Sequence, residues 1–155
     1  MYKSLARLSV ETDGRYATDN ELQFIEDYLA SVEKRISTYE KVRDAEPKII
    51  DKVEKQKQEI NPELFKLNGR DITGICRRDM IDILRCSAGA MLLNEMDYLR
   101  DNMLIWYRTI VRAYQYDRHD DTIYKLLENN TKAHLTPDEA KFMIRVLQLD
   151  HTLLS

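Results

Sequence analysis

Four consecutive residues, Cys76, Arg77, Arg78 and Asp79, are those best suited to chemistry. Positions i and i+3 of a helix share a face, so a helix here would turn the thiol and the carboxylate the same way. The neighbouring guanidinium groups favour the thiolate, the nucleophilic form of cysteine. Such a cluster suits a large, conjugated, acidic ligand: the thiol can bind it covalently, the carboxylate can accept hydrogen bonds from ring N–H groups, and an arginine can pair with its carboxylate tails. The structural alternative is a small buried cysteine with charged residues beside it.

Other thiol chemistry finds less support. A thiol enzyme needs a base near Cys76, and no supporting motif surrounds any of the three histidines, His119, His134 and His151. Cys76 and Cys86 are ten residues apart on one expected helix and cannot clamp a zinc ion together, and Cys86 is expected to pack inward. No glycine loop suited to phosphate is present. We therefore expect neither a metal site nor an enzyme.

Length and composition indicate one all-α domain spanning residues 1–155. The chain has 4 Gly and 3 Pro, against about 19 of the two together at average usage, and this scarcity of turn residues favours a few long helices. Its net charge of −3 argues against nucleic acid as the main partner. No apolar stretch is long enough to cross a bilayer, and no signal sequence is visible at the start. These features predict a cytoplasmic protein without membrane insertion.

The Cys76 cluster is expected to open a long helix that begins near residue 75. Its apolar side carries Met80, Ile83, Leu84, Ser87, Ala88, Met91 and Leu92. A loop with two glycines, residues 66–74, precedes it, and Asn94-Glu95 marks a short break after it. A further apolar stretch covers 103–114, and a polar connection of 117–121 leads to a helix near 121–129.

Capping signals define the other helices. Thr18 and Glu21 form a capping box that opens a helix from about 19 to the low 40s, with an apolar stripe of Leu22, Ile25, Leu29, Val32 and Ile36. Pro47 is expected to start a separate helix, because its missing amide would be unpaired there anyway. Pro62 begins a short turn, and Thr136 caps a last helix whose inward residues include Phe142, Met143, Val146, Leu147 and Leu149.

The N-terminal arm, residues 1–17, precedes the expected globular body at 18–155. It holds a short helix with Leu5, Leu8 and Val10 on one side, too short to be stable alone. Its apolar side must therefore be covered either by the same domain or by a second subunit.

Several motifs in order resemble the phycobiliprotein family, and most closely a divergent allophycocyanin-like protein of the alpha or core type. Cys76–Asp79 resembles the family's C-x-R-D motif, followed at the same spacing by Leu84-Arg85. Upstream, Gly14–Tyr16, Glu21-Leu22 and Leu29–Arg35 resemble the allophycocyanin pattern. Residues 135–140, Leu-Thr-Pro-Asp-Glu-Ala, resemble the start of the family's last helix.

The resemblance implies a globin-like fold with a two-helix N-terminal extension for dimerisation. It implies that Cys76 holds a phycocyanobilin-like linear tetrapyrrole (a bilin) by a thioether, that Asp79 hydrogen-bonds the inner pyrrole nitrogens, and that Arg78 pairs with a propionate. Arg77, Asp82, Ile83 and Tyr107 complete the expected pocket, although Asp82 and Ile83 stand where the family has tyrosines. A salt bridge between subunits would join Arg85 to Glu11 or Asp13, with Tyr16 at the same interface.

The sequence thus predicts a bilin-binding chromoprotein that serves light harvesting, energy transfer or light-responsive regulation, at the cytoplasmic face of thylakoid membranes or free in the cytoplasm. Its partners would be another phycobiliprotein-like subunit, in a homo- or heterodimer, and phycobilisome components. The alternative is a bilin-free interaction protein that acts in phycobilisome assembly or turnover. Intact Cys76, Arg78 and Asp79 favour the first hypothesis, and the missing tyrosines favour the second.

Overall fold

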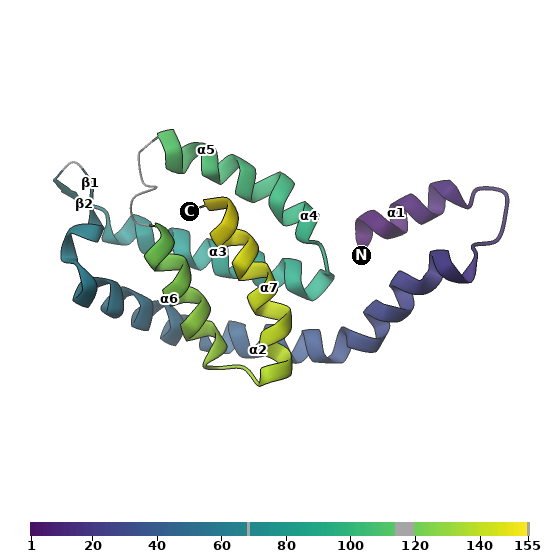
Figure 1. Cartoon of the computed structure of the whole chain (residues 1–155), viewed down its shortest axis with the longest axis horizontal. Helices are drawn as coiled ribbons and strands as arrows, with labels where there is room; N and C mark the ends of the chain where they lie inside the picture. The colour runs from purple at the N-terminus through teal and green to yellow at the C-terminus, as the bar shows by residue number, and fades with distance from the viewer. Residues whose placement is uncertain (68, 114–119, 155) are drawn as a thin grey trace.

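Helices dominate the computed structural model, which describes residues 1–67, 69–113 and 120–154, and the all-α prediction is confirmed (Figure 1). Tyr114, His119 and most of the polar connection expected at 117–121 lie outside the described residues. The elements in order are α1 (Tyr2–Glu11), α2 (Asp19–Ile60), the 3-10 turn η1 (Pro62–Phe65), β1 (Lys66–Leu67), β2 (Arg70–Asp71), α3 (Thr73–Leu93), α4 (Met96–Leu99), the π-helical turn η2 (Arg100–Leu104), α5 (Ile105–Ala113), α6 (Asp120–Lys132) and α7 (Pro137–Leu154).

Helix α2 corrects one prediction, because it runs unbroken for 42 residues and holds Pro47 inside it. Proline removes one backbone donor and its ring crowds the preceding turn. The Pro47 ring lies on the exposed face, whereas Val42, Ala45 and Ile49 on the opposite side are buried. Packing of that buried face on both sides of the proline outweighs the local preference for a helix start.

The capping predictions are confirmed. Thr18 and Glu21 exchange the two hydrogen bonds of a capping box at the start of α2. Thr136 and Glu139 do the same at the start of α7. Asn94 adopts a left-handed conformation (φ 54°, ψ 47°) that ends α3, so the expected break lies where the sequence placed it.

The expected loop at 66–74 contains a short antiparallel hairpin that the sequence pattern did not show. Strands β1 and β2 pair Lys66 with Asp71 and Leu67 with Arg70. Gly69 has a φ of +77°, which only glycine adopts without strain, and so it permits the tight reversal between them. The hairpin leads directly into α3, where the Asp71 carboxylate accepts a hydrogen bond from the Thr73 amide at 2.9 Å.

The core forms where α2, α3, α6 and α7 pack together, with Leu99 and Leu104 added from the segment 96–113. Helix α3 buries the apolar side that the sequence predicted, including Met80, Ile83 and Leu84. Cys86 is exposed rather than packed inward, because it lies on the opposite side of α3. Figure 1 shows α6 and α7 crossing in front of α2 and α3, with the segment α4–α5 above α3, on the side away from α2.

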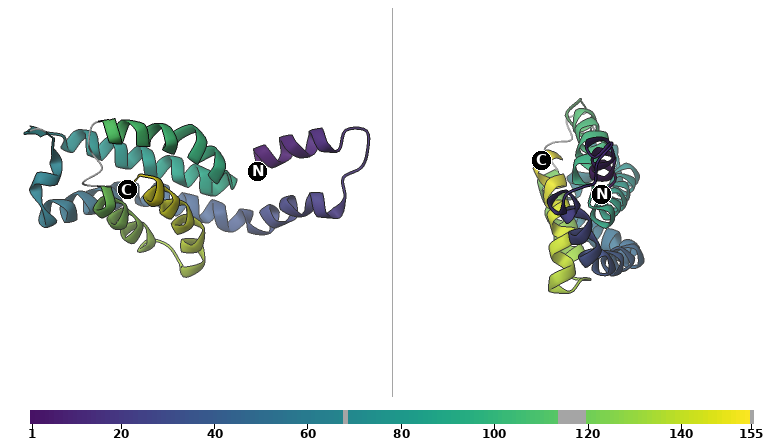
Figure 2. Two further views of the ribbon diagram at one scale, coloured as in Figure 1. Left: turned by 45° about the horizontal axis from the view of Figure 1, so that its top comes forward. Right: turned by 90° about the vertical axis from the view of Figure 1, so that its right-hand side faces the viewer.

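Helix α1 and the first half of α2 form an arm that extends beyond this core (Figure 2). No residue of α1 is buried, and the first buried residue of α2 is Thr38. The predicted stripe on α2 is therefore only partly covered, with Leu29 61% and Ile36 45% exposed. The tip of α1 turns back to the body, where the Met1 ammonium group pairs with Glu95 at 2.6 Å.

None of the helices in the described residues combines the length and the apolar character that crossing a membrane requires.

Candidate functional site

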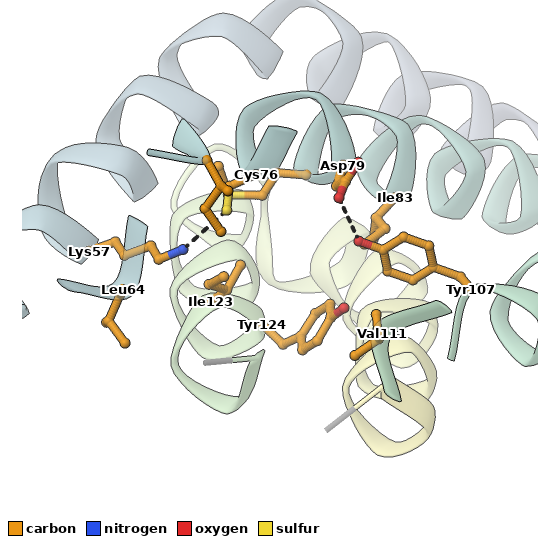
Figure 3. Close-up of a pocket in the computed structure, with 11 residues that line it drawn as sticks. Lys57, Leu64, Cys76, Asp79, Ile83, Tyr107, Val111, Ile123 and Tyr124 are labelled. Carbon is orange, nitrogen blue, oxygen red and sulfur yellow. Dashed lines mark hydrogen bonds between the residues drawn. The ribbon is translucent and has the colours of Figure 1, made fainter. Parts of the chain in front are cut away.

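Cys76 and Asp79 lie one helical turn apart on the inner side of α3 and face one small cavity (Figure 3). The expected common direction of the two side chains is thus present in the structure. The cavity lies between α2, α3, α5 and α6 and measures about 30 Å³, room for one or two water molecules. Its lining residues are Lys57, Leu64, Ile72, Cys76, Asp79, Met80, Ile83, Tyr107, Val111, Ile123 and Tyr124.

The Asp79 carboxylate is held by a hydroxyl group from α5. Tyr107 Oη donates a hydrogen bond to Asp79 Oδ2 at 3.0 Å, and Arg78 Nε lies 3.8 Å from Oδ1. Partial burial raises the pKa of Asp79, while the Tyr107 hydrogen bond and the Arg78 charge partly oppose the rise. The site therefore fixes the position of a half-buried carboxyl group at an apolar wall.

The Cys76 thiol has a cationic neighbour that the sequence analysis did not identify. Lys57 Nζ lies 3.6 Å from Cys76 Sγ and 4.3 Å from the centroid of the Phe65 ring. The Lys57 side chain is fully buried, although it is one of the charged residues of α2. The sequence contained one signal for this burial. Val53 follows Ile50 by three residues and Lys57 follows Val53 by four, so Lys57 continues the buried face of the helix.

The two arginines of the cluster do not converge on the cavity. Arg77 turns toward α2, where it forms ion pairs with Asp51 at 2.6 Å and with Glu54. The Arg78 side chain is 70% exposed. Arg77 therefore joins α3 to α2, and Arg78 lies at the surface beside Asp79.

Of the remaining residues expected in the pocket, two line the cavity and one does not. Ile83 and Tyr107 line the cavity, Ile83 from the α3 turn after Asp79 and Tyr107 from α5. Asp82 is exposed and does not line the cavity.

The residues expected at a subunit interface lie apart within this chain. Arg85 forms a two-pronged ion pair with Glu46 of α2, at 2.7 and 2.6 Å. Glu11 accepts a hydrogen bond from Arg7 at 2.7 Å within α1. Asp13 is exposed and Tyr16 is 96% exposed at the bend of the arm. Any bond between Arg85 and the arm of another chain would therefore compete with Glu46.

The described residues contain no group of three or more His, Cys, Asp or Glu side chains placed to hold a metal ion. His134 is exposed, and the His151 ring stacks on Tyr124 with centroids 6.1 Å apart.

Comparison with known proteins shows two similarities. A family model described as phycobilisome protein matches residues 8–152. The allophycocyanin alpha-B chain of Pyropia yezoensis is 30% identical to this chain over 110 residues, which cover 68% of each protein. The family match extends from the arm to α7 and includes the α3 segment with Cys76 and Asp79.

Proposed function

Because the chain belongs to the phycobilisome protein family, as a divergent allophycocyanin-like member with that family's globin-like helical fold, we propose that it carries a linear tetrapyrrole attached through Cys76. The observation that carries this proposal is the pairing in one cavity of a half-buried thiol with a carboxylate fixed by Tyr107. When bound, the tetrapyrrole supplies absorption of visible light. The protein would use it for light harvesting and energy transfer or for light-responsive regulation, and not for enzymatic catalysis.

Each residue has a separate part in this proposal. Cys76 Sγ would form the thioether. Asp79 would accept hydrogen bonds from the pyrrole N–H groups. A nearby carboxylate favours the positively charged form of the tetrapyrrole, and Asp79 would thus keep the pyrrole nitrogens protonated. Arg78, exposed beside Asp79, would pair with a propionate tail. Tyr107 would keep Asp79 oriented.

The side chains of Cys76, Asp79 and Arg78 fit a tetrapyrrole chemically, but the cavity is too small to hold the whole molecule. A cavity of about 30 Å³ holds water-sized groups only. A bilin that reaches Asp79 must therefore move some of the side chains that line the cavity, of which Tyr124 on α6 is the largest one outside the Asp79–Tyr107 hydrogen bond. Attachment should accordingly repack the contact between α3, α5 and α6.

The exposed arm supports a subunit partner as part of the same proposal. Apolar side chains on α1 and on the first half of α2, among them Val10 at 76% and Leu29 at 61%, are left exposed by the described residues. Another phycobiliprotein-like subunit would cover these side chains, and that subunit would link the chain to phycobilisome components. Such an assembly would lie in the cytoplasm, at the thylakoid surface.

Expression together with a bilin-producing pathway and a bilin lyase tests the attachment. A denaturing gel read for zinc-enhanced bilin fluorescence should show a band in the unaltered chain and in Cys86→Ala, the matched control, because Cys86 is exposed outside the cavity. Cys76→Ala should lose the band. A band that persists in Cys76→Ala, or its absence from the unaltered chain, would contradict attachment at Cys76.

The small cavity favours one second candidate, a bilin-free protein that uses the fold and the arm to bind phycobilisome subunits during assembly or turnover. Absence of the fluorescent band from every variant, together with retention of phycobiliprotein subunits on the immobilised chain, would support it.

A further inference from the structure

A cleft with an excess of positive charge lies where the arm joins the body, between α2, the end of α3 and α7. It measures about 380 Å³, within the size range of sites that bind small molecules, and shares no lining residue with the cavity at Cys76. In the part of the chain that the structure describes, its charged lining residues are the cations Lys34, Arg35, Lys141 and Arg145 and the acid Asp138. The cleft is thus strongly cationic in a chain whose net charge is −3.

Asp138 does not neutralise the two arginines, because two lysines already share its carboxylate. Lys34 Nζ lies 3.3 Å from Asp138 Oδ2, and Lys141 Nζ lies 3.0 Å from Oδ1. Within residues 1–67, 69–113 and 120–154, neither Arg35 nor Arg145 forms an ion pair with a carboxylate. The uncompensated charge of the cleft is therefore mainly that of the two guanidinium groups.

The Arg35 guanidinium group is held in one orientation by α2, α3 and α7. Nε donates to Ser31 Oγ at 2.9 Å, and the two terminal nitrogens donate to the Met91 carbonyl and, at 3.3 Å, to Asn94 Oδ1. Its plane lies over the Phe142 ring, 4.8 Å from the centroid. These contacts cap the end of α3, and each terminal nitrogen retains a second N–H group that can donate into the cleft.

Arg145 brings a second guanidinium group to the same cleft from the exposed side of α7. Burial lowers the pKa of Arg35, and the positive charge of Arg145 lowers it further. Two like charges at one site repel each other, and an anion between them removes that repulsion.

A phosphate monoester matches two arginines better than a carboxylate does. It carries a charge of roughly −1.5 to −2 at neutral pH and three strong acceptor oxygens. Arginine binds phosphate through two parallel N–H···O bonds, so two guanidinium groups can share the oxygens of one phosphate group. A carboxylate offers one charge and two oxygens.

We propose that this cleft binds a small phosphate monoester, with the phosphate group between Arg35 and Arg145 and the organic part against the partly exposed side chains of Met96 and Phe142. Such a ligand would join α2 to α7 at the base of the arm. The inference is independent of the bilin, because no residue of the Cys76 cavity takes part in it.

Isothermal titration calorimetry of the full chain with phenyl phosphate tests the proposal. The ionic strength is kept constant, so that general salt effects on surface charges do not change during the titration. We expect saturable binding of one phenyl phosphate per chain. Benzoate carries a carboxylate on the same ring and should bind about tenfold more weakly, because it has less charge and fewer acceptor oxygens.

Arg145→Gln is the decisive variant, because Arg145 is exposed and its replacement should leave the circular dichroism unchanged. Loss of a charge-assisted pair of hydrogen bonds should weaken phenyl phosphate binding about tenfold or more. Arg112→Gln, exposed on α5 outside the cleft, removes the same charge and should keep the affinity of the unaltered chain.

Three results would each overturn the proposal. The first is the absence of saturable phenyl phosphate binding to the unaltered chain. The second is equal affinity in Arg145→Gln and Arg112→Gln, which would place the ligand elsewhere. The third is equal affinity of the unaltered chain for benzoate and phenyl phosphate, which would contradict the assignment to phosphate.

Discussion

At the scale of single residues, the carboxyl groups of Asp79 on α3 and Asp150 on α7 lie in different environments, which give them different properties. Asp79 lines a cavity and accepts a hydrogen bond from the Tyr107 hydroxyl group, and we propose it as a group that binds a ligand. Asp150 is fully buried in α7, where Ser87 Oγ donates to its Oδ2 at 2.6 Å. Burial raises the pKa of Asp150 from its usual 3.8 to about 7. The first carboxyl group is suited to binding, and the second makes the stability of the fold depend on pH.

Asp79→Asn should separate attachment from spectral tuning. The amide keeps the size of the side chain but loses the negative charge that favours protonated pyrroles. We expect covalent bilin at Cys76 to remain, while the red absorption band weakens and shifts to the blue in the native spectrum. Asp82→Asn, exposed outside the cavity, serves as the control and should leave the band unchanged. An unaltered spectrum in Asp79→Asn would contradict the role of Asp79.

Asp150 should make the folded chain less stable as pH rises. Because its folded pKa of about 7 exceeds the unfolded value, the folded state binds more protons between pH 3.8 and 7, and the free energy of unfolding falls across that interval. The full effect is up to about 4 kcal/mol for a shift of this size. Asp150→Asn should remove this fall, as measured by urea unfolding at a series of pH values.

The window of Asp150 can be distinguished from that of the other strongly shifted buried carboxylate. Lys41 and the Thr136 amide lower the pKa of Glu139 to about 2, so its stabilisation is lost only as pH falls from about 4.5 through 2. A free energy of unfolding that rises between pH 5 and 7 in the unaltered chain would contradict the role of Asp150. So would a fall in that free energy that persists in Asp150→Asn.

At the scale of elements, α2 provides the frame for both the arm and the cavity. Its C-terminal half supplies Lys57 to the cavity and Glu54 to the ion pair with Arg77. Its N-terminal half carries Arg35, whose guanidinium lies 4.8 Å from the Phe142 ring centroid of α7 and which donates to the Met91 carbonyl of α3. An unbroken α2 therefore fixes the direction of the arm relative to the site.

Pro47→Ala should stabilise the chain, because Pro47 lies inside α2 with its ring exposed. Alanine restores a backbone hydrogen bond and removes the crowding of the ring, and the gain is partly offset by the greater freedom of the unfolded chain. We expect an increase of about 1–3 kcal/mol in the free energy of unfolding. Chemical denaturation with unchanged circular dichroism is the measurement. A decrease would mean that a bend at Pro47 is needed for packing.

At the scale of the whole molecule, the arm carries exposed apolar side chains that do not pack against the core. Leu29 and Val10 stand on the two limbs of the arm shown in Figure 2, on α2 and α1. The arm is attached to the body at the Met1–Glu95 ion pair and at the Arg35 contacts. The described residues thus leave apolar side chains of the arm uncovered, and we propose that a partner subunit covers them.

Leu29→Glu should weaken association through the arm. A charge placed in a contact between apolar side chains must lose its hydration, which costs more than the apolar contact gains. In sedimentation velocity we expect the unaltered chain to form a species larger than the monomer, and Leu29→Glu to be monomeric. Ile60→Glu, 58% exposed at the other end of α2, is the control and should behave as the unaltered chain. Equal sedimentation of Leu29→Glu and the unaltered chain would contradict the assignment of the arm as an interface.

Local and periodic features of the fold were readable from the sequence. The capping boxes at Thr18 and Thr136, the break at Asn94 and the buried side of α3 depend on neighbours within a few residues, so the sequence contains their causes. The shared direction of Cys76 and Asp79 follows from helix geometry for the same reason. These features fix the helices and the thiol–carboxylate pair of the candidate site.

Tertiary packing decided the features whose causes lie far apart in the chain. Pro47 continues a helix because the residues around it are buried by α3, α6 and α7, which the local sequence does not show. Arg77 turns to acids of α2 rather than to the cavity, and Tyr107 finds Asp79 across 28 positions of sequence. Lys57 meets Cys76 only because the end of α2 packs beside the start of α3. The sequence by itself determined which residues could react, and the packing of the helices determined which of them share one cavity.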